Sequence, residues 1–272
     1  MLRNFRSYLV AGGMPEVVQD YIDSSYSLIR TRQLQSELVD QYRTDIAKYA
    51  GKRAFAVRSI FDRLPLELEG ENHRFILSSL KEGARLDEYA EDFLWLTNAG
   101  VGLNVSRATE ARSPLLRTES ASFFKLYESD TGMLVSRFPQ STARAIYLDQ
   151  KSVNLGGVFE NAVAQELAAL GIPAWYYFTT AEGEVDFLVD GKGGRVVPIE
   201  VKSGVKVRSH AALDNLLAKP GLKIPEAIVL SRENISQEGK VTYLPIYMTF
   251  CLDELVEREV DAGDFRFAPV AL

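Results

Sequence analysis

The stretch "GEVDFLVDGKGGRVVPIEVKSG", residues 183–204, consists of two short apolar runs on either side of a glycine-rich turn. Runs of this length and composition around such a turn predict two neighbouring antiparallel strands. Four charged residues interrupt the apolar runs, although charges are normally kept off buried strands. The pattern therefore predicts both a β-hairpin and a reason for charges to gather on it.

Alternation along each strand predicts where the charged side chains point. In the first strand, we expect Val185, Phe187 and Val189 on one face, with Glu184 and Asp186 on the opposite face.

In the second strand, Val197, Ile199 and Val201 share one face, so Glu200 and Lys202 share the other. The hairpin is therefore expected to bring Asp186, Glu200 and Lys202 together.

A preceding helix adds a further acid. The segment "GGVFENAVAQELAAL", within a helix predicted over 156–170, carries Glu160 on the same stripe as Val163, Ala164 and Leu167. A buried carboxylate without a partner costs several kcal/mol. Its partner could be Lys202 or a cation shared with the strand acids. One lysine does not offset three carboxylates, so a divalent ion is the better expectation.

This order of residues resembles the PD-(D/E)xK nuclease pattern: an acid on a helix, an acid on a strand, then Glu200-Val201-Lys202. The resemblance implies that Asp186 and Glu200 hold Mg²⁺ (or Mn²⁺), with the Val201 carbonyl as a further ligand. It also implies that Lys202 orients the attacking water and that Glu160 positions metal-bound water or a second ion. Val185 stands where the pattern often has proline.

Two alternatives remain open for this cluster, because Glu-x-Lys alone has no specificity. The four residues form either a metal-dependent catalytic site or a structural ion-pair cluster in a fold that no longer cleaves. Lys206 and Arg208 follow the second strand and could contact a phosphate backbone; solvated surface charges explain them equally well.

Composition limits the chemistry further. Cys251 is the single cysteine, and the two histidines, His73 and His210, lie far apart in the sequence. Thiolate zinc sites, disulfides and histidine-rich metal sites are thereby excluded, which leaves a hard, oxygen-liganded cation. The net charge of −6 comes mainly from residues 252–272. No apolar run suits a membrane span or a signal peptide, so we expect a cytoplasmic protein without membrane contact.

The chain of 272 residues is predicted to be mixed α/β (α+β). We expect a helical N-terminal segment at 1–52, a winged-helix-like domain at 53–137, a restriction-endonuclease-like α/β domain with a mixed sheet at 151–251, and an acidic tail at 252–272. The winged-helix prediction rests on helices near 54–64, 73–83 and 85–100, followed by two strand-like runs at 101–107 and 122–130.

The third of these helices would be the one that enters the DNA groove, but its charge opposes that role. Its exposed face is predicted to carry Asp87, Glu88, Glu91 and Asp92 without any lysine or arginine. Carboxylates are repelled by phosphates, so this helix is expected to face protein or solvent rather than bases.

Eight segments in order extend the resemblance: "YLVAGGMPE", "DIAKY", "FKLYESDTGML", "GGVFENAVAQEL", "WYYF", "GEVDFLV", "PIEVKSG" and "LPIYM". Together they are similar to the C-terminal half, called domain of unknown function 4143, of bacterial and archaeal AAA-family ATPases. The similarity runs to about residue 255. It implies an AAA ATPase domain, fused or separate, as partner. The chain has no G-x-x-x-x-G-K-[ST] phosphate loop, so we expect no ATP hydrolysis from it.

Two functions from different classes follow. The first is Mg²⁺-dependent phosphodiester hydrolysis, or engagement of DNA without cleavage, by the last domain. The second is a non-catalytic interaction module that regulates an AAA ATPase through a degenerate nuclease fold. Titration with Mg²⁺ or Mn²⁺ would distinguish them.

Overall fold

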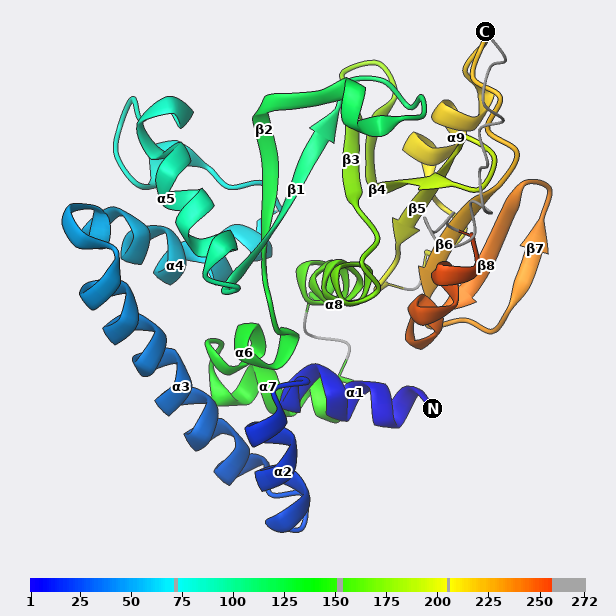
Figure 1. The fold of residues 1–272 in the computed structure, drawn as a ribbon. Coiled ribbons are helices and arrows are strands. Elements are labelled where there is room, and N and C mark those ends of the chain that lie inside the picture. The colour runs from blue at the N-terminus through cyan, green and yellow to red at the C-terminus, as the bar shows by residue number, and fades with distance from the viewer. Residues whose placement is uncertain (71–72, 151–153, 205, 256–272) are drawn as a thin grey trace, which may run out of the picture.

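The computed structural model describes residues 1–70, 73–150, 154–204 and 206–255. The predicted mixed α/β class is confirmed, since a helical N-terminal region leads into one mixed sheet with helices on both faces (Figure 1). Of the predicted acidic tail, only 252–255 lie within the described residues. No helix in the described ranges combines the length and the apolar character that crossing a bilayer requires.

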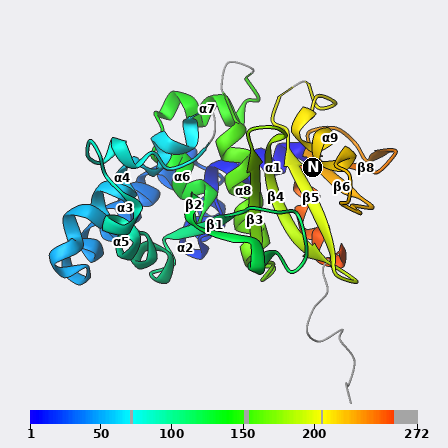
Figure 2. The same ribbon diagram turned by 90° about the horizontal axis from the view of Figure 1, so that it is seen from above.

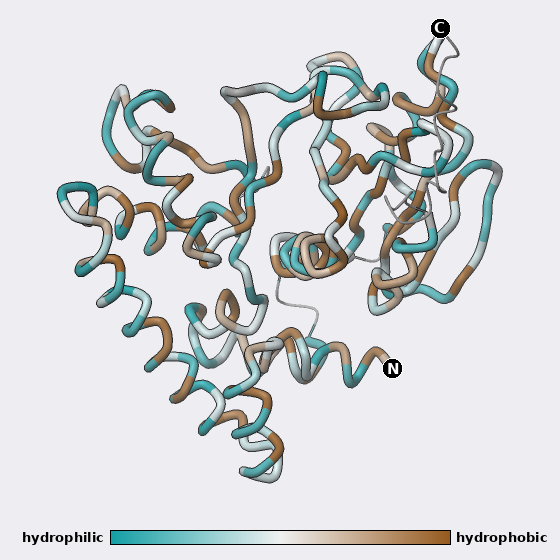
Figure 3. The backbone as a smooth tube through the Cα atoms, viewed as in Figure 1, coloured by the Kyte–Doolittle hydropathy of each residue, from teal (hydrophilic) through white to brown (hydrophobic). Residues whose placement is uncertain are grey.

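The N-terminal region is built from amphipathic helices, as the spacing of its apolar residues predicts. Figure 3 shows hydrophobic and hydrophilic residues alternating along the longest helix, α3, whose buried side includes Val39 and Ile46. The elements of this region are α1 (Leu2–Ala11), α2 (Pro15–Asp23), α3 (Leu28–Tyr49), η1 (Gly51–Arg53), α4 (Ala54–Glu69), η2 (Leu77–Ser79) and α5 (Leu86–Asn98).

The turn "AGGMPE" between α1 and α2 packs closely against helix α6 (Thr131–Ser136). Asp130 caps this helix by accepting a hydrogen bond from the Met133 amide at 2.9 Å, and its other oxygen accepts one from the Gly13 amide at 2.7 Å. Gly12 has a φ of 77°, and a side chain there would collide with the Asp130 carboxylate. These glycines therefore allow α1 to end directly against α6.

Eight strands of the described chain form a single sheet in the order β2-β1-β3-β4-β5-β6-β8-β7. The pairs β1/β3, β5/β6 and β6/β8 are parallel, and the remaining neighbours are antiparallel. The strands are β1 (Gly102–Ala108), β2 (Glu119–Glu128), β3 (Ala174–Thr179), β4 (Gly183–Gly191), β5 (Arg195–Val201), β6 (Ala227–Ser231), β7 (Ser236–Glu238) and β8 (Val241–Pro245). The connecting elements are η3 (Leu115–Thr118), α7 (Gln140–Tyr147), α8 (Gly156–Ala169), α9 (Ala211–Ala218) and η4 (Ile246–Leu255).

Helices cover both faces of this sheet (Figure 2). Helix α8 packs with the N-terminal helices in the larger core, which includes Phe187 and Ile199. Helix α9 covers the opposite face in a smaller core with Val185 and Leu188. The central strands β5 and β6 are thus buried on both sides, which suits their parallel pairing.

The structure differs from the predicted winged helix in two respects. Residues 73–83 do not form the expected second helix; the short η2 is the one helical turn in this part of the described chain. The carboxylate of Glu67 accepts hydrogen bonds from this segment, from the Ile76 amide at 3.0 Å and the Ser79 hydroxyl at 2.7 Å. In addition, the β1–β2 hairpin does not stand alone, because β1 pairs with β3, with Ser106 beside Trp175. The sheet therefore crosses the boundary predicted between the second and third domains.

One residue of the acidic face predicted for α5 is also placed differently. Asp92 is completely buried and forms an ion pair with Arg53, so it does not face solvent. Asp87, Glu88 and Glu91 are exposed as expected.

Strict alternation along β4 was a wrong prediction, because the strand contains a bulge. Trp175 of β3 lies opposite Leu188, whereas Tyr177 lies opposite Val185, so β4 has two residues between these pairs where β3 has one. Val185 consequently packs in the smaller core while Phe187 packs in the larger one.

Candidate functional site

Glu160 of α8 lies at the centre of a buried network of charges. Its Oε1 lies 2.6 Å from His73 Nδ1, and its Oε2 accepts hydrogen bonds from Lys125 Nζ at 3.1 Å and the Tyr127 hydroxyl at 3.0 Å. Burial alone would raise the pKa of Glu160, but Lys125 and His73 outweigh it and lower the pKa to about 2. The helix acid predicted from its apolar stripe is therefore ionised and fully partnered.

Lys125 of β2 joins Glu160 to a strand acid. It is completely buried, and its Nζ lies 2.7 Å from Glu184 Oε1 of β4. Burial would lower the pKa of Lys125, but Glu160 and the neighbouring acids hold it well above the usual value. Arg74 pairs with the other oxygen of Glu184 and stacks over the Phe178 ring, with its guanidinium 4.0 Å from the ring centroid.

Asp186 of β4 is held by the backbone rather than by a cation. Its Oδ2 accepts a hydrogen bond from the Val201 amide at 2.7 Å, which ties the end of β5 to β4. Burial, together with the charges of Glu160 and Glu200, raises the pKa of Asp186 well above its usual value. This carboxyl group therefore favours a bound proton or a nearby cation.

Glu200 and Lys202 of the Glu-x-Lys segment pair with each other, with Lys202 Nζ 2.7 Å from Glu200 Oε1. The other oxygen, Oε2 of Glu200, is buried without a hydrogen-bond partner among the described residues. Burial raises the pKa of Glu200 despite Lys202, and Glu200 in turn raises the pKa of Lys202. The Lys202 side chain is 25% exposed, so it is the most accessible group of the four predicted residues.

The structure thus brings the four predicted residues into one electrostatically coupled cluster. Sequence reasoning missed its other members. The missed residues that contact Glu160 or Glu184 directly are His73, Arg74, Lys125 and Tyr127. The alternation of "SFFKLYE" puts Lys125 and Tyr127 on one face of β2, which was a usable signal once that face was known to be buried. No comparable sequence pattern pointed to His73 or Arg74.

The charge balance of this cluster changes the expectation of a metal. Four carboxylates, those of Glu160, Glu184, Asp186 and Glu200, meet three permanent cations and a histidine. The premise that one lysine faces three carboxylates is therefore wrong. Within the described ranges, no three histidine, cysteine or acidic side chains are arranged around a common point as metal ligands. As the side chains stand, Asp186 and Glu200 offer the carboxylate oxygens that a hard ion could still use.

Lys206 and Arg208, the two cations that could contact a phosphate backbone, differ in their surroundings. Lys206 is exposed to solvent. Arg208 is engaged at the edge of the sheet, with Glu238 at 2.7 Å and Glu233 at 3.3 Å, and its guanidinium lies 3.6 Å from the centroid of the Tyr243 ring. Arg208 would therefore have to break existing pairs to bind a phosphate.

Comparison with known families gives two matches, one for each part of the chain. A family model described as "Domain of unknown function (DUF8612)" matches residues 2–143, which is more than half of the chain. The chain belongs to this family. A second model, "Domain of unknown function (DUF4143)", matches residues 155–248 and so contains all four predicted site residues.

The resemblance to DUF4143 is confirmed over this C-terminal part alone. It was predicted to extend over nearly the whole chain, whereas the N-terminal half matches a different family. No match to the chain is found among curated proteins or among solved structures.

Proposed function

We propose that the chain is a non-catalytic interaction module on a nuclease-like fold, and that its partner is an AAA ATPase domain, fused or separate. The observation that carries the proposal is the position of Lys125, which is fully buried between Glu160 and Glu184. Lys125 supplies a neutralising charge to both of these acids from within the fold, so neither Glu160 nor Glu184 needs a metal ion as its counter-charge. The cluster then acts as an internal brace between α8 and three strands.

Burial of the cluster supports the same conclusion. Glu160, Asp186 and Glu200 are each at most 9% exposed. A phosphodiester must come within a few ångströms of the ion that activates it. With these acids covered, the site favours a structural role.

The partner is supported by the resemblance to ATPase C-terminal halves and by the surface of the N-terminal helices. Large apolar side chains stand exposed on α3 and α4, namely Tyr49 at the end of α3 and Phe55 and Leu66 on α4. Exposed apolar groups are common on protein-binding surfaces.

One observation favours a second candidate, Mg²⁺- or Mn²⁺-dependent cleavage of DNA. The buried Oε2 of Glu200 lacks a hydrogen-bond partner among the described residues, and a bound cation would relieve the raised pKa of Asp186. Mg²⁺ is often held by one or two carboxylates, with water and phosphate completing its shell. In that case Asp186 and Glu200 would hold the ion, Glu160 would support it, and Lys202 would face the phosphate.

Calorimetric titration of the whole chain with Mg²⁺ and then Mn²⁺ tests the choice. Our proposal predicts no saturable binding and no cleavage of single- or double-stranded DNA or RNA. Saturable binding that is lost in Asp186→Asn/Glu200→Gln, together with cleavage lost in Lys202→Met, would establish the nuclease instead. The matched control is Asp87→Asn/Glu91→Gln, which removes two exposed carboxylates on α5.

The partner is tested separately by co-expressing the chain with an AAA ATPase domain from the same organism. Light scattering after size exclusion should show a complex that Phe55→Ser weakens. Absence of any complex with such domains would contradict the interaction role.

A further inference from the structure

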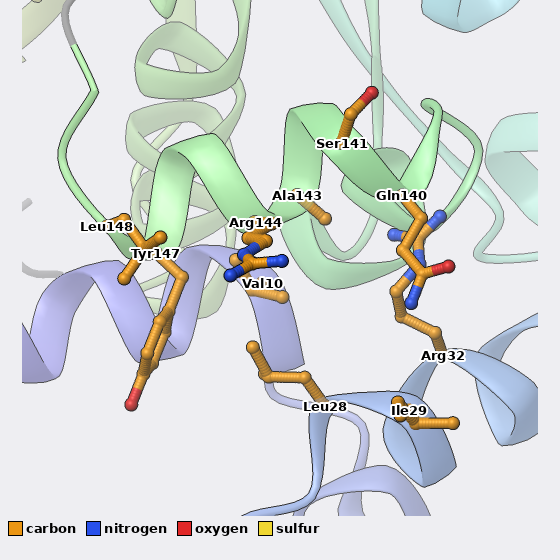
Figure 4. Close-up of a pocket in the computed structure, with 10 residues that line it drawn as sticks. All are labelled: Val10, Leu28, Ile29, Arg32, Gln140, Ser141, Ala143, Arg144, Tyr147 and Leu148. Carbon is orange, nitrogen blue, oxygen red and sulfur yellow. The ribbon is translucent and has the colours of Figure 1, made fainter.

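A groove of about 630 Å³, which shares no residue with the acid cluster, lies between α1, the beginning of α3, and α7. Figure 4 shows Leu28 and Ile29 of α3 facing the side chains of α7 across it, with Val10 of α1 between them. Tyr147 and Leu148 close the other end. The walls are therefore mainly apolar, and the volume is within the range of small-molecule sites.

Two guanidinium groups, those of Arg32 and Arg144, line this apolar groove, and no carboxylate is among its lining residues. Arg32 donates to the main-chain oxygens of Val135 at 3.1 Å, Ser136 at 2.9 Å and Phe138 at 2.7 Å, which are neutral acceptors. Its charge is thus held in place but not neutralised. Burial correspondingly lowers the pKa of Arg32 from its usual value.

Arg144 is the more available of the two. Among the described residues it has no hydrogen bond or ion pair through its side chain, and it projects from α7 into the groove (Figure 4). The acid that follows α7, Asp149, is already paired with Arg6 at 2.9 Å and Arg232 at 2.8 Å. The groove therefore presents uncompensated positive charge next to apolar walls.

We propose that this groove binds a small amphipathic carboxylate, a molecule with an aliphatic chain and one anionic head. The chain would lie against Val10, Leu28 and Tyr147, and the head would pair with Arg144. A guanidinium binds a carboxylate through two parallel hydrogen bonds, which fixes the head more firmly than a neutral group could. A fully polar anion such as phosphate would leave the apolar walls in water, so it fits less well. This site is independent of the interaction role proposed above.

Decanoate is the probe, measured on the whole chain by displacement of anilinonaphthalene sulfonate fluorescence and by calorimetry. Decanoate should bind saturably and decanol at least about tenfold more weakly, since loss of a charged hydrogen bond costs one to two orders of magnitude. Arg144→Met keeps the apolar stem and should weaken decanoate by a similar factor while leaving decanol unchanged. Arg117→Met, at an exposed arginine outside the groove, should leave both unchanged.

A second variant protects the test against an indirect effect of Arg144. Ile29 is 71% exposed, so Ile29→Glu should fold normally and repel decanoate from the rim. Absence of saturable decanoate binding, or equal binding by wild type and both groove variants, would overturn the proposal.

Discussion

Among single residues, Lys125 gives the strongest evidence that the charge cluster has a structural role. It is completely buried and holds Glu160 at 3.1 Å and Glu184 at 2.7 Å. Removing one partner of a buried ion pair leaves the others charged in a medium that solvates them poorly. The charge is thus required by the fold whether or not the site binds a metal.

We expect Lys125→Met to lower the free energy of unfolding by about 3–5 kcal/mol, because two carboxylates lose their buried counter-ion. Chemical denaturation of the full chain measures the loss. Lys192→Met, at an exposed lysine in the β4–β5 turn, is the control and should change stability by less than about 0.5 kcal/mol. A loss of similar size in both variants would contradict the role of Lys125.

Residue-level prediction succeeded where one local pattern contained the signal. Glu160 was predictable from its place on an apolar helical stripe, and Glu200 and Lys202 from their shared strand face. Lys125 and His73 were not, because they reach the cluster from segments 35 and 87 residues before Glu160. A single sequence shows which face a residue takes but not which distant strand lies beside it.

A second buried acid, Glu128, gives a pH-dependent test. Arg137 Nη1 lies 2.7 Å from its Oε2, yet its Oε1 has no partner among the described residues. Burial raises the pKa of Glu128 from 4.5 to about 7, although Arg137 opposes this.

Between pH 4.5 and 7 the folded chain therefore binds more protons at Glu128 than the unfolded chain does. This contribution to stability is complete below pH 4.5 and is lost as the pH rises to 7, by roughly 3 kcal/mol. Denaturation at several pH values should show that Glu128→Gln removes this component of the pH dependence. If the wild type and the variant lose stability in parallel between pH 4.5 and 7, Glu128 is ionised throughout and the expectation fails.

At the scale of elements, the sequence was most informative where glycine turns separated strongly apolar runs. The strands at 174–179 and 183–191 and the helix at 156–169 were all expected close to their observed bounds. The three-residue strand β7 has no apolar pattern, so it could not be found. The bulge in β4 escaped as well, because it depends on pairing with β3 rather than on composition.

The contact between α4 and α8 depends on a glycine in α8. A side chain at Gly157 would overlap the carbonyl oxygen of Leu68 at the end of α4. Alanine favours a helix over glycine by about 1 kcal/mol. Even so, we expect Gly157→Ala to destabilise the chain by about 1–2 kcal/mol, because the two helices must move apart.

Thermal or chemical unfolding measures whether Gly157→Ala lowers or raises the free energy of unfolding. Gly204→Ala is the control, since no atom lies within 4 Å of a side chain added there, and it should change stability little. A Gly157→Ala variant more stable than wild type would mean that propensity, and not the helix contact, decides this position.

At the scale of the whole molecule, the two family matches divide the chain between residues 143 and 155, but the sheet does not. Strand β1, from the first part, pairs with β3 from the second. Three side chains that form hydrogen bonds with Glu160 also come from the first part. The order of predicted helices and strands suggested separate domains, because each part has its own set of both. Their shared sheet is a non-local pairing that no local pattern reports.

A fragment consisting of residues 154–255 should therefore fail to fold on its own. It would expose the β3 edge that β1 normally covers. It would also leave Glu160 of α8 without its partners His73, Lys125 and Tyr127, at a cost of several kcal/mol. Small domains have only about 5–15 kcal/mol of net stability, so such a loss removes cooperative folding.

Circular dichroism melting should show no sharp transition for the fragment, whereas residues 1–255 should melt cooperatively. Adding a fragment of residues 1–153 should restore the transition, because it returns the missing strand and charges together. A sharp melt of 154–255 alone would show instead that the charge cluster tolerates solvent in place of its partners.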